Sequence, residues 1–156
     1  MPHIHQFIDW TIVAYVVHGR RVLFIFHKEL KKWLPLGGHI ELNEDPDEAL
    51  VREVQEESGL EAFEVLAPKL SIEAQERKFL YTPAYVDIHP INKKHKHIGL
   101  VYFLRTKTDT IHLAEQEHTD IRWFTEEELD DSQFHLEPGV RFYAKDAIQR
   151  AVQDTA

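Results

Sequence analysis

The chain contains no cysteine. This absence excludes disulfide bonds, thiolate zinc sites and a cysteine nucleophile, and it fits a cytoplasmic protein. Long apolar runs are also absent: the longest, such as residues 12–17 and 22–26, are strand-sized and far shorter than the roughly 20 residues that cross a bilayer. Residues 1–9 lack a basic segment followed by an apolar run. The sequence therefore predicts neither a signal peptide nor a membrane partner.

Positive charge is scarce. The chain has 18 lysines and arginines against 27 aspartates and glutamates, which gives a net charge of −9 with histidine neutral. Because such a surface repels phosphates, we expect no DNA or RNA polymer as a partner. An acidic protein that acts on a small phosphate compound needs a cation at its site, and a divalent metal is the simplest candidate. The length of 156 residues and the hydrophobic fraction of 43% predict one globular domain over residues 1–156.

The apolar pattern predicts strands and helices that alternate along the chain. The runs at 10–17 and 22–26 flank His18-Gly19-Arg20 and indicate a β-hairpin covered on both faces. Further strands are predicted at 62–66, 81–88, 97–106 and 120–124, and a turn-forming stretch at 33–38. Helices are predicted at 45–58, 125–130 and 140–152. We therefore expect an α/β fold in which a mixed sheet lies between helices.

The first of these helices has clear signals at both ends. Asp45 suits the N-cap, Pro46 suits the first helical position, and Glu48 stands three residues after Asp45, as in a capping box. Gly59 suits the position that ends the helix. The second helix has a similar beginning, because Glu128 stands three residues after Thr125. These signals predict where both helices begin and where the first helix ends.

Three glutamates share one stripe of the first helix. Glu53, Glu56 and Glu57 stand at positions i, i+3 and i+4, which lie on the same side at about 100° per residue. Leu50 and Val54 occupy the adjoining stripe, which we expect to face the core. Glu57 then falls at the edge of the buried surface.

This acidic stripe is unfavourable without a counter-charge. The carboxylates repel one another and lie near the negative end of the helix dipole, where only Arg52 supplies a nearby positive charge. Taken alone, three glutamates on a helix are usually a solvated surface. Bound Mg²⁺ or Mn²⁺ would give the stripe a function, because both cations take carboxylate oxygens and retain water for a phosphate substrate.

The stripe belongs to a longer motif over residues 38–60. Its letters are Gly38-(five residues)-Glu44-(seven residues)-Arg52-Glu53-Val54-Gln55-Glu56-Glu57-Ser58-Gly59-Leu60. This segment resembles the Nudix box, G-x5-E-x7-R-E-U-x-E-E-x-G-U with U a bulky apolar residue, and it matches at every position. Seven fixed identities would coincide by chance on the order of once in 10⁸ placements. The chain is therefore identified as a member of the Nudix (MutT-like) hydrolases, which implies an α/β/α sandwich.

The resemblance also implies the chemistry and the residues that carry it. Nudix hydrolases use a divalent metal, usually Mg²⁺ and alternatively Mn²⁺, to help water cleave a phosphoanhydride bond. The implied metal ligands are Glu53, Glu56, Glu57, the carbonyl of Gly37 and, directly or through water, Glu44. Arg52 would brace the glutamates and face the substrate, and Gly38 would shape the substrate loop. The family often forms homodimers.

The identity of the general base is undecided between a residue of the box and a residue of a later loop. Within the box, Glu53 is the first candidate to take the proton of the attacking water. Many family members instead use a glutamate on a later loop, where Glu115 and Glu117 lie in this chain. The sequence does not decide between them.

Residues outside the box do not specify the substrate. ADP-ribose enzymes often have a proline about fifteen residues after the box, and dinucleoside polyphosphate enzymes have a tyrosine slightly later. This chain has Gln75 and Phe79 in that region. We expect a small-molecule substrate, a nucleoside diphosphate linked to another group, such as ADP-ribose or a nucleotide sugar. An oxidised nucleoside triphosphate is the alternative, and a non-catalytic nucleotide sensor is the alternative from another class, disfavoured because every box glutamate is retained.

Aromatic and histidine residues offer weaker signals. Trp33 lies beside the glycines and is the best candidate to stack on a base, whereas Phe79, Tyr81 and Tyr102 are more typical of a core. His95 and His97 flank Lys96, and such an i, i+2 pair can bind metal or phosphate. Without cysteines or a clear third ligand, the pattern favours an exposed basic loop that attracts an anionic substrate over a zinc site.

Overall fold

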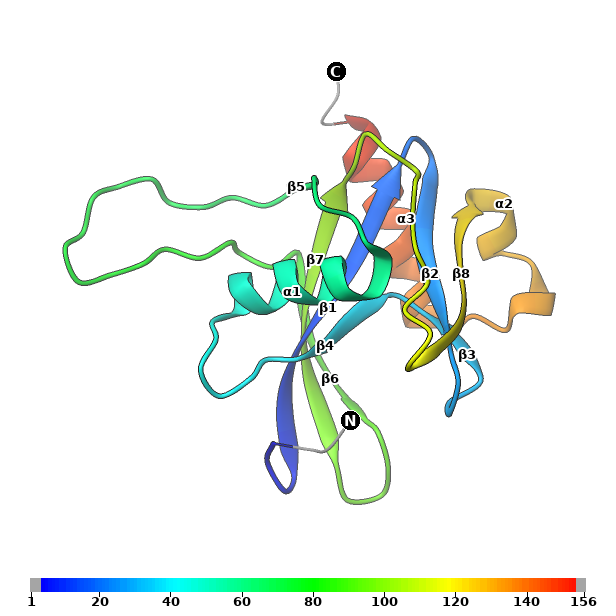
Figure 1. Ribbon diagram of the computed structural model, residues 1–156, viewed down its shortest axis with the longest axis horizontal. Coiled ribbons are helices and arrows are strands. Elements are labelled where there is room, and N and C mark those ends of the chain that lie inside the picture. The colour runs from blue at the N-terminus through cyan, green and yellow to red at the C-terminus, as the bar shows by residue number, and fades with distance from the viewer. Residues whose placement is uncertain (1–3, 154–156) are drawn as a thin grey trace.

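A mixed sheet forms the middle layer of the molecule (Figure 1). The computed structural model describes residues 4–153, so the outermost three residues at each end of the predicted domain 1–156 lie outside the described part. The strands are β1 (Ile8–His18), β2 (Arg21–His27), β3 (Lys32–Leu34), β4 (Leu36–His39), β5 (Glu64–Val65), β6 (Tyr85–Pro90), β7 (Lys96–Arg105) and β8 (His118–Thr125). The helices are α1 (Pro46–Ser58), α2 (Glu126–Leu129) and α3 (Pro138–Gln153), with a short 3₁₀ helix at Ser132–Phe134. None of the helices within residues 4–153 is long and apolar enough to cross a membrane.

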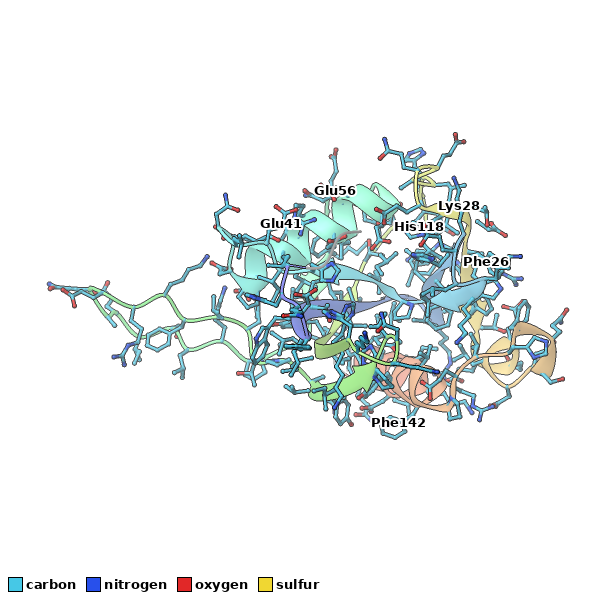
Figure 2. The ribbon with its side chains drawn as sticks, turned by 90° about the horizontal axis from the view of Figure 1, so that it is seen from below. Phe26, Lys28, Glu41, Glu56, His118 and Phe142 are labelled. Atoms are coloured by element: carbon cyan, nitrogen blue, oxygen red, sulfur yellow. The ribbon has the colours of Figure 1, made fainter. Side chains whose placement is uncertain are left out.

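Strand β1 lies at the centre of the sheet. It pairs in parallel with β7 and antiparallel with β2 and β4. Ile12 and Val16 point into a buried cluster with residues of α1, and Tyr15 and Val17 point into a second cluster with residues of α3. Figure 2 shows α1 and α3 on opposite sides of the sheet. This arrangement confirms the α/β fold, the mixed sheet between helices and the prediction that the central strands are covered on both faces.

Helix α1 begins and ends where the sequence predicts. The carboxylate of Asp45 accepts the N–H of Glu48 at 3.0 Å, and Glu48 accepts the N–H of Asp45 at 2.8 Å, which completes the capping box. Gly59 ends the helix in the left-handed conformation. Leu50 and Val54 are completely buried, which confirms the predicted core face. The predicted capping box of Thr125 and Glu128 is also present, at the start of α2.

The predicted turn at 33–38 is wrong. The stretch contains the end of β3 and most of β4, which are separated by Pro35. Strand β4 pairs with β1 through Gly37, and a Cβ atom there would collide with the backbone oxygen of Ile12. The glycine therefore permits a close approach between two strands, a role that its turn-like sequence pattern does not reveal.

Two predicted strands are displaced or shortened. The strand expected at 62–66 reduces to Glu64–Val65, and the one expected at 81–88 runs from Tyr85 to Pro90. The intervening residues 66–84 form a long loop that extends away from the sheet (Figure 1). The loop returns to α1, where the N–H of Tyr81 donates to the carboxylate of Asp47 at 3.2 Å. It therefore places its residues beside the helix that carries the box.

Candidate active site

Arg52 lies at the centre of a cluster of charged residues on α1. It binds both carboxylate oxygens of Glu44, from Nε at 3.0 Å and from Nη2 at 2.5 Å. Its Nη1 donates to Glu53 at 2.9 Å and to Glu56 at 3.3 Å, and its Nη2 donates to the carbonyl of His39 at 3.0 Å. The Arg52 guanidinium lowers the pKa of Glu44. One cation thus ties the loop before the helix to two glutamates of the stripe, which is the ion pairing that the motif implies for Arg52.

Two glutamates of the stripe are buried. Glu53 is 3% exposed and Glu57 is 7% exposed, whereas Glu56 lies open to solvent. Burial, and then the nearby charge of Glu57, raises the pKa of Glu53 to about 7 despite the contact with Arg52. Removing two carboxylates from water beside one another is costly unless a cation compensates them. The structure confirms that Glu57 lies at the edge of the buried surface, as predicted.

Glu57 is held by two different strands. The N–H of Gly37 on β4 donates to its Oε1 at 2.7 Å, and Nε2 of His118 on β8 lies 2.5 Å from its Oε2. The contact with His118 is short, but the two groups are not aligned as a hydrogen bond. Nδ1 of this buried ring also lacks a hydrogen bond to any residue that the structure describes. Sequence reasoning missed His118, because no spacing within the box points to a residue so far along the chain.

Gly38, the first residue of the box, and Gly37 directly before it lie close to the buried glutamates of α1. A Cβ atom at Gly38 would collide with the carboxylate of Glu53, so glycine lets the loop pass directly under that side chain. Gly37 contacts the site through its N–H, whereas the resemblance implied a role for its carbonyl. The carbonyl of Gly37 as a metal ligand and Gly38 as a substrate contact stay predictions.

The donor set fits a hard divalent cation. Glu53, Glu56 and Glu57 offer carboxylate oxygens from one stripe of α1, and Glu56 is open to solvent and hence to an incoming substrate. The unaligned contact of the His118 ring beside Glu57 is a further sign that a cation suits this position. Both oxygens of Glu44 are engaged by Arg52, so Glu44 supports the cluster through that arginine.

The later loop with the alternative bases reaches the same side of the sheet. Lys28 holds this loop, because its N–H donates to the carbonyl of Glu117 at 3.2 Å and its ammonium donates to the carbonyl of Glu115. Glu117 directly precedes His118, whose ring meets Glu57. In Figure 2, Lys28 and His118 lie on the same side of the sheet as Glu56. Both loop glutamates are exposed, and the choice of base stays open.

Trp33 is explained by packing. Its ring meets Phe26 at 5.2 Å and Phe124 at 5.0 Å between centroids, both edge-on. It packs against the buried cluster beneath α3, whereas the box lies over the opposite face of the sheet. The structure does not bring Trp33 together with the glutamates, and its contact with a base stays a prediction. Tyr102 is buried as predicted.

Comparison with known proteins connects this geometry to a family. The NUDIX domain model matches residues 9–145. A NUDIX-family hydrolase from Clostridium perfringens is 30% identical, with a TM-score of 0.79 over 90% of this chain and 96% of that chain. Two further structures share the fold: a MutT NUDIX hydrolase from Burkholderia pseudomallei (21% identity, TM-score 0.63, 92% and 97% covered) and the NUDIX domain of Shewanella oneidensis NrtR complexed with ADP ribose (14%, 0.62, 99% and 91%). Since the family model spans most of the chain and a full box covers residues 38–60 around α1, this protein belongs to the NUDIX family and is a hydrolase.

Proposed function

We propose that the chain is a divalent-metal-dependent hydrolase that cleaves the phosphoanhydride bond of a nucleoside diphosphate linked to another group, such as ADP-ribose or a nucleotide sugar. The observation that carries this proposal is the pair of buried carboxylates, Glu53 and Glu57, of which only Glu53 is paired with the guanidinium of Arg52. A helix face built only for stability would place lysines at such positions. The pair is favourable when a divalent cation lies against it.

Glu53, Glu56 and Glu57 would hold Mg²⁺, or Mn²⁺ in its place. When bound, the metal neutralises charge on the phosphates and lowers the pKa of a water that it carries. Arg52 keeps Glu53 and Glu56 together through its Nη1 atom and anchors them to Glu44. The protein thus supplies a fixed arrangement of charge where negative charge develops during the reaction.

A base must take the proton of the attacking water. Glu53 is our first candidate, because it lies within the box beside the proposed metal, where the attacking water would be held. Glu115 and Glu117 on the later loop are the alternatives. Replacement of the true base by glutamine should lower kcat selectively, so each of the three candidates predicts a different impaired variant.

A groove beside the box supports a nucleotide as the substrate. Its volume is about 580 Å³, and Arg52 and Glu56 line it together with Lys69, Lys78 and Tyr81. The ammonium of Lys69 lies 4.0 Å from the centroid of the Tyr81 ring. The groove thus combines two cations, which suit phosphates, with an aromatic side chain next to the proposed metal site.

The two lysines are anchored at the N-terminus of α1. Lys78 binds Asp45 at 2.6 Å, and Lys69 binds Asp47 at 3.0 Å. These ion pairs attach the loop 66–84 to the helix and keep its positive charge beside the groove. The loop is therefore the part of the chain that we propose to distinguish one nucleotide derivative from another.

The substrate is tested by measuring phosphate release, coupled to a phosphatase, from a panel of nucleotides with Mg²⁺, with Mn²⁺ and with chelator. The panel contains ADP-ribose, nucleotide sugars, dinucleoside polyphosphates and oxidised nucleoside triphosphates. Metal-dependent turnover of ADP-ribose or a nucleotide sugar is the expected result. Turnover of the oxidised triphosphates alone would overturn the substrate, and thermal stabilisation by one nucleotide without any turnover would overturn the reaction.

A further inference from the structure

One aspartate and three histidines meet at the end of the sheet where β1, β4 and β7 come together. Oδ2 of Asp9 lies 3.2 Å from Nε2 of His39 and 3.2 Å from Nε2 of His95. Nε2 of His39 lies 3.2 Å from Nε2 of His97. Asp9, His95 and His97 each offer a donor atom within 4.8 Å of the other two. We propose that these four residues form a second metal site, distinct from the box, that takes Zn²⁺ or a cation of similar chemistry.

The cluster and the box lie on opposite faces of the sheet. Asp9 pairs with His97 in the parallel register of β1 and β7. Successive side chains of a strand alternate between faces, so Asp9 shares its face with Tyr15, which packs beneath α3. In Figure 1, the first residues of β1 and β7 lie together at the lower end of the sheet, away from α1. A cation here would therefore be separate from one held by the glutamates of α1.

Three contacts in the cluster have the spacing of neighbouring donors around a tetrahedral zinc ion. Zinc binds imidazole nitrogen and carboxylate oxygen at about 2.0–2.1 Å, which places neighbouring donors about 3.3 Å apart. Three of the six donor–donor distances among the four side chains are 3.2 Å, and the donor atoms of Asp9, His95 and His97 all lie within 4.8 Å of one another. A set of three imidazoles and one carboxylate suits zinc, whereas Mg²⁺ prefers oxygen donors throughout. The set needs no cysteine, which this chain lacks.

The hydrogen bond of His95 directs a lone pair into the cluster. Nδ1 of His95 lies 3.1 Å from the carbonyl of Gln6, and because a carbonyl only accepts, Nδ1 carries the proton. In the neutral ring, Nε2 then presents its lone pair to the carboxylate of Asp9. A metal ion bound by both atoms would stabilise this close approach of the lone pair and the carboxylate. A histidine whose other nitrogen donates to a backbone carbonyl is the usual arrangement of a metal ligand.

The cluster is joined to the catalytic loop by His39. This residue follows Gly38, and its carbonyl accepts the Nη2 hydrogen of Arg52 at 3.0 Å. A metal on the ring of His39 would hold β4 in place beneath the arginine that organises the box. A metal at this site would therefore stabilise the fold and hold β4 in position next to Arg52.

The test is a titration of the metal-stripped full chain with Zn²⁺ in excess Mg²⁺, which occupies the box. We expect one Zn²⁺ per chain, with at least about a hundredfold weaker binding in His97→Ala, because loss of a ligand costs more than loss of an outer contact. His89→Ala is the matched control, since His89 is an exposed neighbour outside the donor set, and it is expected to bind as the wild type does. Glu56→Gln is expected to keep the zinc, which separates this site from the box.

Cobalt provides a second measurement that needs no variant. Co²⁺ bound to the wild-type chain is expected to show the intense visible absorption of a tetrahedral site, and Zn²⁺ is expected to displace it. Circular dichroism shows whether His97→Ala folds. If it does not, the Co²⁺ spectrum of the wild type decides whether the chain has a tetrahedral metal site. The proposal is overturned if the wild type binds no Zn²⁺ in excess Mg²⁺, or if binding survives His97→Ala and is lost in Glu56→Gln.

Discussion

Nε2 of His118 lies 2.5 Å from Oε2 of Glu57, while the other oxygen of this carboxylate accepts the N–H of Gly37 at 2.7 Å. The last turn of α1 is therefore fixed to two strands, β8 and β4, through a single side chain. Neither contact follows from the spacing of the box. Both contacts orient the carboxylate of Glu57, which is a proposed metal ligand.

His118→Ala removes one of these two supports. We expect an overall fold like that of the wild type, with Mg²⁺ affinity or kcat/KM lowered by about 10- to 100-fold, because contacts that orient metal ligands usually have effects of this size. Steady-state kinetics over a range of Mg²⁺ concentrations measure the change. His89→Ala serves as the control, because that ring is exposed and lies on β6. Unchanged kinetics in His118→Ala would show that the contact with Glu57 is incidental.

Glu57→Gln tests the ligand role of the buried carboxylate itself. We expect the loss of most activity, with a fold that is intact and equally or slightly more stable without metal, because the change relieves repulsion from Glu53. Activity assays and thermal melts in chelator measure the two effects. The control is Glu61→Gln, the same change at an exposed glutamate outside the box. A fully active Glu57→Gln would remove Glu57 from the metal site.

Val54→Asp tests the packing of α1. Val54 is completely buried, so the new charge would be desolvated and the free energy of unfolding should fall by about 3 kcal/mol or more. Val51→Asp is the matched control on the same helix, because Val51 is 41% exposed and should change stability by less than about 1 kcal/mol. Urea unfolding measures both. Equal effects of the two variants would mean that the helix is rotated relative to the structure.

The pH dependence of stability tests the environment of Glu53. Its folded pKa of about 7 lies above the ordinary value of 4.5, so folding favours its protonated form. The resulting stabilisation, relative to the ionised form, is complete below pH 4.5 and is lost as the pH rises to about 7. This loss amounts to about 3 kcal/mol at most.

Urea unfolding of the metal-free chain and of Glu53→Gln, at several pH values from 4.5 to 8, measures this loss as a difference. The wild type should lose stability relative to the variant as the pH rises, and saturating Mg²⁺ should reduce the difference. A pH-independent difference between the two chains in chelator would contradict the raised pKa.

The sequence was sufficient to predict the helices and the central strands because their signals are local. The capping boxes of Asp45 and Thr125 and the terminal Gly59 depend only on neighbouring residues. The burial of Leu50 and Val54 follows from helical periodicity alone. Strand β4 was mistaken for a turn because Gly37 is required by the approach of β1, which is a tertiary effect.

The residues that the sequence did not reveal come from distant parts of the chain. His118 reaches Glu57 only because β8 pairs with β2. The expected exposed histidine loop is wrong for His95, which is buried, although Lys93, Lys94 and Lys96 are exposed as predicted. The third ligand missing from the pair of His95 and His97 is Asp9, which the parallel pairing of β1 and β7 brings beside them. Such partners become visible only when the strand order is known.

The most direct measurement is the rate of nucleotide hydrolysis as a function of free Mg²⁺, for the wild type and for Glu56→Gln, with the best substrate of the panel. Glu56 is exposed, so its replacement should leave the fold intact. If the box glutamates hold the metal, the wild type shows saturable dependence on Mg²⁺ and no turnover in chelator, and Glu56→Gln needs at least about tenfold more Mg²⁺ or loses activity at any concentration. Wild-type turnover in chelator, or an unchanged Mg²⁺ dependence in Glu56→Gln, would contradict metal-dependent hydrolysis at this site.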